Sequence, residues 1–210
     1  MFTFKKPTEA DIIAYLLAQI RLPFSYPEVG LTRSKPPICY DVDRQTICLG
    51  QGEQVFQLAR RAIENWEMFP REMTELYWPD KPLAEGVVVA VVFRAAFFWS
   101  LNACRIVYTI DESCGRGAGR IDRFGFAYGT LPDHLECGEE RFTVEWRHQD
   151  DSVWYDLLAV SRPRHPLARL AYPMVRRQQR RFRILSAHSM QRTVASARAV
   201  PESAEPCTQS

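Results

Sequence analysis

A strand, a turn, a second strand and a long arginine-rich helix follow one another without interruption between residues 123 and 182. Apolar and polar residues alternate through residues 140–147, as in a strand with one buried face. The polar turn at 149–152 leads into a second apolar strand, residues 153–161, which predicts an antiparallel hairpin. A sheet that runs directly into a long helix predicts an α+β fold in which the helix closes one face of the sheet.

Three further strands are expected before this hairpin, at residues 86–93, 101–111 and 124–131, all rich in β-branched and aromatic residues. The first is a continuous apolar run, which predicts that both of its faces are covered. Gly125 and Gly129 interrupt the third, and a glycine within a strand indicates a bulge or a close approach of another chain segment.

Two amphipathic helices are expected in the N-terminal part of the chain. Thr8 and Asp11 have the spacing of a capping pair, which predicts that the first helix begins there. The second is predicted over Glu53–Phe69, where apolar residues recur on one side, and Pro70 ends it. The proline-rich chain between them, residues 25–52, predicts a loop with short extended pieces.

The C-terminal helix is expected to begin near Pro166, to kink at Pro173 and to continue to about Met190. Its expected apolar face consists of Leu167, Leu170, Ala171, Met174, Val175, Phe182 and Leu185. Its expected basic face consists of Arg169, Arg176, Arg180 and Arg183, flanked by Arg177 and Arg181. We therefore expect one α+β domain over residues 1–190 and a disordered tail over 191–210, which is rich in small and polar residues.

Positive charge is concentrated at the C-terminal end of the chain. Residues 1–156 contain 17 Lys and Arg against 23 Asp and Glu, whereas residues 157–210 contain 10 Arg against 2 Glu. The expected surface basic patch consists of Arg176, Arg177, Arg180 and Arg181. Such a face is either simply solvated or docks on an anionic membrane surface. We do not expect nucleic-acid binding, because this face lacks aromatic residues and a recognised motif.

The six cysteines contain no C-x-x-C pair, and no metal site is predicted. Glu9 and Asp11 interrupt the apolar N-terminal stretch, which argues against a secretory signal. The apolar segment Gly86–Cys104 carries Arg94 near its centre, which favours strands over a membrane span. We therefore expect reduced thiols in a cytoplasmic protein, with peripheral membrane association left open.

No motif in the sequence identifies a reaction. A G-x-S-x-G elbow, an H-E-x-x-H pair and a phosphate-binding loop are all missing from it, and no cofactor is predicted. The residues most suited to orienting the polar end of a ligand are polar side chains on apolar strands and one histidine in a turn. They are Arg105, Tyr108, Tyr128, His134, Glu145 and Tyr155. An alternative is that Arg105 and Glu145 pair across the outer face of the sheet.

Several sequence blocks resemble an uncharacterised family of bacteria and plants, the domain of unknown function nineteen-ninety. These blocks are GFAYGTLPDH, GEERFTVEW, VWYDLLAVSRP and PLARLAYPMVRRQQRRF, with SYPEVGLTR and LGQGEQVFQLARRAIENWEMF before them. The resemblance covers roughly residues 20–190; the glycine-rich stretch Ser113–Ile121 and the tail after Met190 depart from it. The family's layout is similar to the START-like, Bet v 1-like helix-grip superfamily. That similarity implies a curved antiparallel sheet gripping a long C-terminal helix, with additional N-terminal helices.

Members of that superfamily bind hydrophobic small molecules or lipids, and a few are enzymes. The resemblance therefore implies a cavity between the sheet and the C-terminal helix that binds a hydrophobic molecule. Two alternatives remain open: an enzyme that uses His134, Tyr128 or Glu145 on the same scaffold, and a peripheral membrane-surface protein that acts through its arginine-rich helix. A cavity filled by Phe and Trp side chains would argue against both the binding and the enzymatic readings.

Overall fold

The computed structural model describes residues 2–77, 82–95, 98–134, 136–164 and 172–199. Eight antiparallel strands in this part of the chain form one sheet. They are β1 (Phe2–Thr3), β2 (Asp41–Gln51), β3 (Thr74–Tyr77), β4 (Val88–Ala95), β5 (Phe98–Cys114), β6 (Ile121–Thr130), β7 (Glu136–Arg147) and β8 (Ser152–Pro163). Their order is β2-β8-β7-β6-β5-β4-β3, and β1 pairs with β5.

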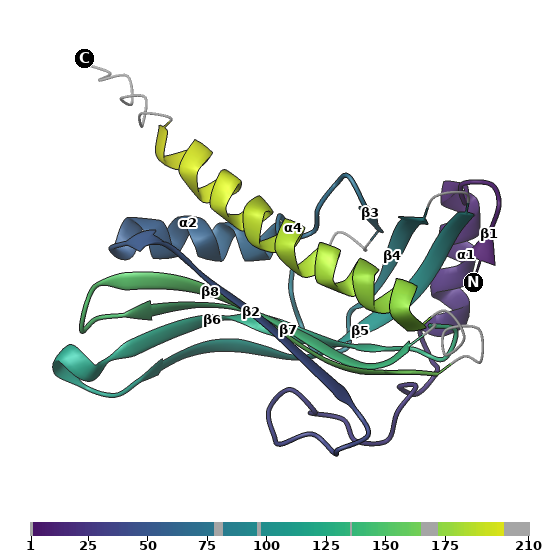
Figure 1. Ribbon diagram of the computed structural model, residues 1–210, viewed down its shortest axis with the longest axis horizontal. Helices are drawn as coiled ribbons and strands as arrows, with labels where there is room; N and C mark the ends of the chain where they lie inside the picture. Colours follow the sequence, from purple (N-terminus) through teal and green to yellow (C-terminus); the bar gives the residue numbers. More distant parts are fainter. Residues whose placement is uncertain (1, 78–81, 96–97, 135, 165–171, 200–210) are drawn as a thin grey trace, which may run out of the picture.

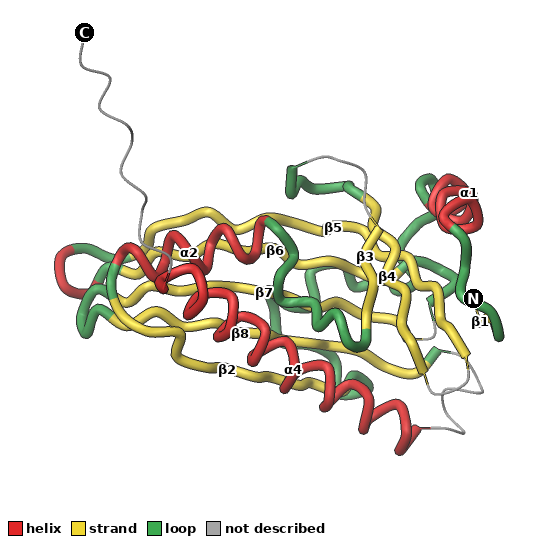
Figure 2. The backbone as a smooth tube through the Cα atoms, turned by 90° about the horizontal axis from the view of Figure 1, so that it is seen from above, coloured by secondary structure: helices red, strands yellow, loops and turns green. Residues whose placement is uncertain are grey.

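The helices are α1 (Glu9–Gln19), α2 (Glu53–Glu64) and α4 (Tyr172–Ala199), and a short 3₁₀ turn, η1 (Gly117–Gly119), joins β5 to β6. Helices α2 and α4 lie on one face of the curved sheet, here called the inner face (Figure 1). Figure 2 shows α4 crossing the strands obliquely from α2 towards β2. The predicted fold class is thus confirmed: a curved antiparallel sheet grips a long C-terminal helix, and further helices lie N-terminal to it.

Apolar side chains of α2 and α4 cover the inner face. On α2, Val55, Ala59 and Ile63 are spaced one turn apart and are all buried. Met190 and Val194 of α4 belong to the same cluster. Each buried Val, Ile or Met side chain contributes about 1.5–3 kcal/mol, so the second half of α4 is held mainly by apolar burial.

Strand β4 is covered on both faces, as its continuous apolar run predicts. Val89 and Val91 belong to the inner core, whereas Val88 and Val92 pack with Ile12 of α1 on the outer face. Both faces of β4 are therefore buried, and α1 is the element that covers its outer face.

Both ends of α1 are capped by side chains. The Thr8 hydroxyl accepts from the Asp11 N–H at 3.2 Å and the Asp11 carboxylate accepts from the Thr8 N–H at 2.9 Å, which confirms the predicted capping pair. At the other end, the Arg105 guanidinium donates to the carbonyl oxygens of Ile20 at 2.9 Å and Leu22 at 2.8 Å. A cation at a helix C-terminus also favours the helix dipole.

A single buried carboxylate, that of Glu139, holds the segment 23–40 against the outer face. Its two oxygens accept four hydrogen bonds, from the Tyr26 hydroxyl at 2.7 Å, the Gly30 N–H at 2.5 Å, and the Thr32 N–H and hydroxyl, each at 3.0 Å. Charge-assisted hydrogen bonds of this kind are the strong ones, and each donor would be costly to leave unpaired. The segment therefore covers the outer face as an ordered layer (Figure 1).

The structure differs from the sequence prediction in two elements of the N-terminal half. The expected loop over residues 25–52 contains an eleven-residue strand, Asp41–Gln51, which β8 stabilises through pairing along its length. Helix α2 ends at Glu64 rather than at Phe69, because Trp66 adopts a φ of 57° and its ring packs 4.6 Å from that of Phe126. Tertiary contacts override the local pattern in both cases.

Helix α4 also differs from its expected extent. It continues past Met190 to Ala199, and Val194 is buried against the core. The predicted start at Pro166 lies outside the described residues, as do residues 200–210 of the expected tail. The added residues make about two and a half turns, and burial of Val194 against the core stabilises them.

A substitution at Gly129 would test how tightly segment 23–40 packs on β6. An added Cβ at this position would lie 2.1 Å from the Tyr26 hydroxyl and 3.0 Å from the Phe24 ring. We expect Gly129→Ala to lower the free energy of unfolding by about 2–3 kcal/mol in urea denaturation. Gly119→Ala is the matched control, since nothing lies within 4 Å of its added Cβ. Equal stabilities of the two variants would contradict this account.

Candidate functional site

Of the six residues that the sequence predicts to contact a ligand, Tyr128 and Tyr155 lie on the inner face. The Tyr128 hydroxyl donates to a Glu140 carboxylate oxygen at 2.6 Å, and the Tyr155 hydroxyl lies 2.7 Å from the Ser186 hydroxyl of α4. Both tyrosines are buried, and burial raises the pKa of each well above its ordinary value. These two side chains therefore act as neutral hydrogen-bonding groups.

Arg105 and Tyr108 lie on the outer face, because a bulge in β5 brings residues three apart to the same side. Arg105 caps α1 and does not form the expected pair with Glu145. The Tyr108 hydroxyl lies 2.7 Å from that of Thr32, and the Arg33 guanidinium stacks 3.7 Å above its ring. Both residues thus hold the outer layer in place.

Glu145 and His134 do not reach the inner face either. Glu145 accepts from Arg123 at 2.8 Å and from Arg147 at 2.6 Å on the outer face. Burial opposes its ionisation, but these two arginines outweigh that effect and lower its pKa. His134 lies in the turn after β6, where its Nδ1 accepts from the Glu136 N–H at 3.1 Å; burial lowers its pKa to about 4, so the imidazole is neutral.

Aromatic side chains fill the middle of the space between the sheet and α4, where a cavity was expected. They are Trp66, Phe69, Phe126, Tyr128, Phe142 and Phe182. The Phe69 ring lies 5.5 Å from Phe142 and 5.4 Å from Phe182, and Phe182 lies 6.0 Å from Phe93. Rings at these separations are in contact, so this central region is packed core, and its filling by Phe and Trp side chains argues against a ligand cavity there.

Polar side chains replace this apolar packing between the first half of α4 and strands β2, β6, β7 and β8. We call this group the polar seam. It consists of Asp41, Asp43, Tyr128, Glu136, Glu140, Ser161, Tyr172, Arg176, Gln179 and Arg183.

The Asp43 carboxylate is the main acceptor of the polar seam. Both terminal nitrogens of Arg176 donate to it, and the Arg183 Nη2 atom forms an ion pair with the same group at 3.0 Å. The Tyr172 hydroxyl donates to Asp41 at 2.9 Å. The first half of α4 is therefore attached to edge strand β2 by ion pairs and hydrogen bonds.

A second group of contacts attaches α4 to β7 and β8. The Gln179 amide donates to Glu136 at 2.5 Å and to the Ser161 hydroxyl at 3.3 Å, and its oxygen accepts from Arg176 at 2.7 Å. Burial raises the pKa of the Glu136 carboxyl, although the bond from Gln179 and the charge of Arg176 oppose this. Polar contacts thus continue along the helix from β2 to β7.

Glu140 and Arg183 form the inner end of the polar seam. Burial raises the pKa of Glu140 to about 7, and the hydrogen bond from Tyr128 and the charge of Arg183 only partly oppose this. The Nη1 atom of Arg183 is buried and has no hydrogen-bond partner among the described residues. A protonatable carboxyl and an unused guanidinium donor thus lie at one place in the interior.

Arg176 and Arg183 were expected on the exposed face of the C-terminal helix, and the structure corrects this. Both point towards the sheet, because Asp43 on β2 offers a carboxylate that a pattern of apolar residues cannot reveal. Arg177, Arg180 and Arg181 of the expected patch are exposed, and none has an ion-pair partner within the described part of the chain. Of the expected apolar face, Met174 is exposed and Phe182 is buried.

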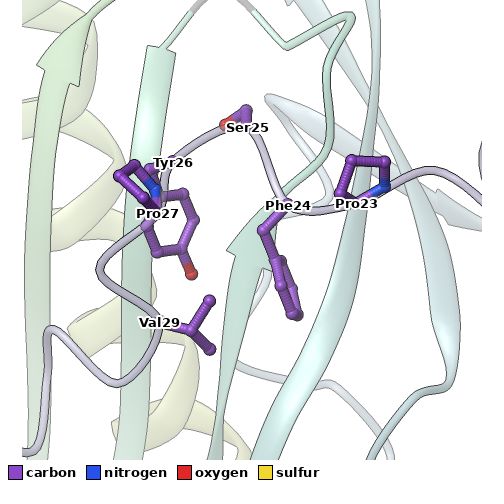
Figure 3. A pocket seen from close by; sticks show the side chains of 6 residues that line it. All are labelled: Pro23, Phe24, Ser25, Tyr26, Pro27 and Val29. Atoms are coloured by element: carbon purple, nitrogen blue, oxygen red, sulfur yellow. The ribbon is translucent and has the colours of Figure 1, made fainter.

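A hollow of about 530 Å³ is lined by Pro23, Phe24, Ser25, Tyr26, Pro27 and Val29. Figure 3 shows these side chains. The polar groups of the hollow are already bonded within the protein: the Tyr26 hydroxyl donates to Glu139, and the Ser25 hydroxyl lies 2.6 Å from that of Thr130. A ligand site needs polar groups that converge on the ligand. The hollow therefore reflects how the segment folds onto the sheet.

Sequence reasoning missed Glu140, Asp43 and Arg183. Extending the alternation of β7 backwards from Phe142 would have placed Glu140 on the inner face. The alternation of β2 would have placed Asp43 on the face of Ile47 and Leu49, which pack on the inner core, had that strand been recognised. Nothing in the sequence of α4 distinguishes Arg183 from its exposed neighbours.

The described residues contain no group of three or more His, Cys, Asp or Glu arranged to hold a metal ion. Cys39, Cys48, Cys104, Cys114 and Cys137 are free thiols. Among the described helices, none combines the length and the apolar character that spanning a membrane requires.

Comparison with known proteins identifies relatives along most of the chain. The family described as "Domain of unknown function (DUF1990)" matches residues 25–189. A UPF0548 protein of Dictyostelium discoideum is 34% identical over 212 residues, covering 93% of this chain and 97% of the relative. A UPF0548 protein of Deinococcus radiodurans is 33% identical over 192 residues, covering 86% and 92%. All ten residues of the polar seam lie within residues 25–189, the part of the chain that the family model matches.

Solved structures with a similar fold share little sequence with the chain. A norcoclaurine synthase point mutant of Thalictrum matches with a TM-score of 0.48 and 8% identity, covering 76% of this chain and 97% of that structure.

The raised pKa of Glu140 predicts a pH-dependent stability. Folding favours the protonated carboxyl, so the stability that Glu140 contributes is complete below its ordinary pKa of 4.5 and is lost as the pH rises through about 7. Between pH 4.5 and pH 8 the wild type should lose about 3 kcal/mol relative to Glu140→Gln, whose amide cannot ionise. Chemical denaturation of both proteins across this range measures the difference.

Glu145→Gln is the control for this experiment, because the pKa of Glu145 is lowered. The stability that Glu145 contributes is present above its ordinary pKa and is lost as the pH falls. Its substitution should therefore cost most at neutral pH and least in acid, the opposite trend to that of Glu140. Parallel pH profiles for wild type and Glu140→Gln would show that Glu140 is not held as an acid.

Proposed function

The chain belongs to the DUF1990 family, and from its geometry we propose that it binds a small hydrophobic molecule between the sheet and the first half of α4. The polar seam orients the ligand, and the neighbouring aromatic rings contact its apolar part. Tyr128, predicted from the sequence, is retained as a contact, and Glu140 and Arg183 are added to it.

One observation carries this proposal: the buried Arg183 Nη1 has no partner in the described part of the chain. A buried donor without an acceptor costs about 1–3 kcal/mol. A ligand oxygen at this position would recover that free energy. The Glu140 carboxyl lies 2.6 Å from the Tyr128 hydroxyl and is near enough to Arg183 for the charge of that side chain to lower its pKa. These groups could therefore contact the same polar head of a ligand.

The different attachment of the two halves of α4 supports entry of the ligand beneath its first half. Met190 and Val194 fix the second half within the apolar core. Arg176 and Gln179 fix the first half through side-chain contacts that water can replace. Local opening uses the least stable contacts of a structure, so the first half of α4 is the part that would move aside.

The filled interior limits the size of the ligand. The Phe69 and Phe182 rings occupy the centre, 5.4 Å apart, and the ligand would have to displace Phe182 or lie beside it. A molecule of about ten to twelve carbons buries enough apolar area to compensate a modest displacement, at about 0.8 kcal/mol per buried CH₂. We therefore propose a small amphiphile rather than a bulky multi-ring lipid.

We do not extend the proposal to catalysis through His134, Tyr128 and Glu145. Tyr128 is bonded to Glu140, Glu145 lies on the outer face, and His134 is in the turn after β6. No hydrogen bond joins any two of the three in the described residues, although an acid–base site requires such convergence.

A second candidate function, docking on an anionic membrane surface, is favoured by a separate observation. Helix α4 contains seven arginines and no acidic residue. Arg177, Arg180 and Arg181 are exposed on it and have no ion pair among the described residues. Each exposed arginine near an anionic surface contributes about 1 kcal/mol, so three could hold the protein weakly at a membrane.

Native mass spectrometry of freshly purified protein, followed by organic extraction, tests the binding proposal. We expect a discrete bound mass that disappears on denaturation and that Arg183→Met reduces at least about tenfold, since removing a buried hydrogen bond to a charged group costs about 1.5–3 kcal/mol. Arg180→Met, an exposed arginine of the same helix, is the matched control. If Arg183→Met proves unstable, Arg183→Lys retains a charge for Asp43 but loses the second donor. Wild-type protein without a bound mass, and with no uptake from an amphiphile panel, would contradict the proposal.

Sedimentation with phospholipid vesicles tests the membrane proposal. Wild-type protein should bind vesicles that contain phosphatidylserine more than neutral ones, and the binding should weaken as salt is raised from 50 to 500 mM. Replacing Arg177, Arg180 and Arg181 by Gln should abolish the difference. Binding that is equal for neutral and anionic vesicles would rule out this surface.

A further inference from the structure

The polar seam contains more carboxyl groups than guanidinium groups. Its acids are Asp41, Asp43, Glu136 and Glu140, and its cations are Arg176 and Arg183. Both guanidinium groups already share the carboxylate of Asp43. Therefore the positive charge of Arg183 is compensated although one of its nitrogens remains without a hydrogen bond.

From this composition we infer that the site selects amphiphiles with a neutral oxygen head, such as an alcohol or a ketone, over those with a carboxylate. The inference rests on the proposed binding function and names the class of ligand for that same site. A neutral oxygen can accept from the Arg183 Nη1 without adding charge. A carboxylate would accept from it equally well. However, it would add a negative charge to the polar seam, which already contains more carboxyl groups than guanidinium groups.

The distances make this repulsion strong enough to matter. A head group bonded to the Arg183 Nη1 would lie close to Asp43, because the other terminal nitrogen of Arg183 forms an ion pair with Asp43 at 3.0 Å. Glu140 and Glu136 act on the same region, since the charge of Glu136 raises the pKa of Glu140. Two unit charges about 8 Å apart at an effective dielectric constant near 20 repel by about 2 kcal/mol, which corresponds to more than a tenfold loss of affinity.

The remaining titratable groups around the site do not offset the excess of carboxyl groups over guanidinium groups. Tyr128 on β6 and Tyr155 on β8 stay neutral, because burial raises their pKa values well above the ordinary value. Cys104 on β5 is buried and its pKa is also raised, so its thiol is neutral. Tyr172 on α4 donates to Asp41, which raises the pKa of that tyrosine. Thus the described elements that face the site bring no third cation to it.

Isothermal titration of the full chain with 1-decanol and with decanoate at pH 8 tests the inference. The two probes have the same chain length and differ in the charge of the head. We expect decanol to bind at least about tenfold more tightly, because decanoate meets the excess of carboxylates. Decanoate that binds as tightly as decanol would overturn the inference.

Glu136→Gln provides a direct test of the electrostatic cause. The amide oxygen can still accept from Gln179, whereas one negative charge is removed. This variant should bind decanoate about tenfold more tightly than wild type does. Glu145→Gln removes a charge from the outer face and should alter neither affinity. An unchanged decanoate affinity in Glu136→Gln would overturn the electrostatic selection.

Failure of the inference and failure of the proposed function give different results. If neither probe binds wild type and no mass is retained in native mass spectrometry, the proposed function falls and this inference falls with it. If both probes bind equally and Arg183→Met weakens both, the binding function stands and only the selection against a charged head is wrong.

Discussion

The antiparallel sheet carries apolar side chains on both faces, and the arrangement of the other elements follows from the need to cover both. On the inner face, α2 and the second half of α4 supply a continuous apolar layer. On the outer face, α1 covers β4 and β5, and the segment 23–40 covers β7 and β8. The outer layer is irregular chain whose polar backbone must be satisfied. The buried carboxylate of Glu139 accepts from two of its backbone N–H groups and from two of its side-chain hydroxyls.

Helix α4 is bound to the sheet in two physically different ways. Its second half is buried among apolar residues such as Met190 and Val194. Its first half is attached through charged and amide side chains, above all the shared carboxylate of Asp43. Apolar burial is non-directional, whereas polar contacts depend on geometry and exchange with water. The contrast divides one helix into an anchored part and a part that can open at lower cost.

The same contrast explains why the interior combines a packed aromatic centre with an incompletely satisfied polar end. The rings of Phe69, Phe142 and Phe182 pack against one another and leave little room at the centre. Next to them, Glu140 retains a proton near neutral pH, and Arg183 keeps one buried donor without a partner. Buried groups of this kind cost stability. Their position beside the more easily opened half of α4 is what makes them the candidate binding groups.

The sequence alone determined the elements whose pattern is local. The alternation of β7, the capping pair of Thr8 and Asp11, and the doubly covered run of β4 could all be derived from residue spacing, and the family resemblance supplied the helix-grip layout. Only the tertiary structure decided which polar residues point inward. The β5 bulge placed both Arg105 and Tyr108 outside, and pairing with Asp43 drew Arg176 and Arg183 inside. Hydropathy periodicity records burial of apolar groups, but a buried charge is positioned by a partner distant in sequence, which periodicity cannot reveal.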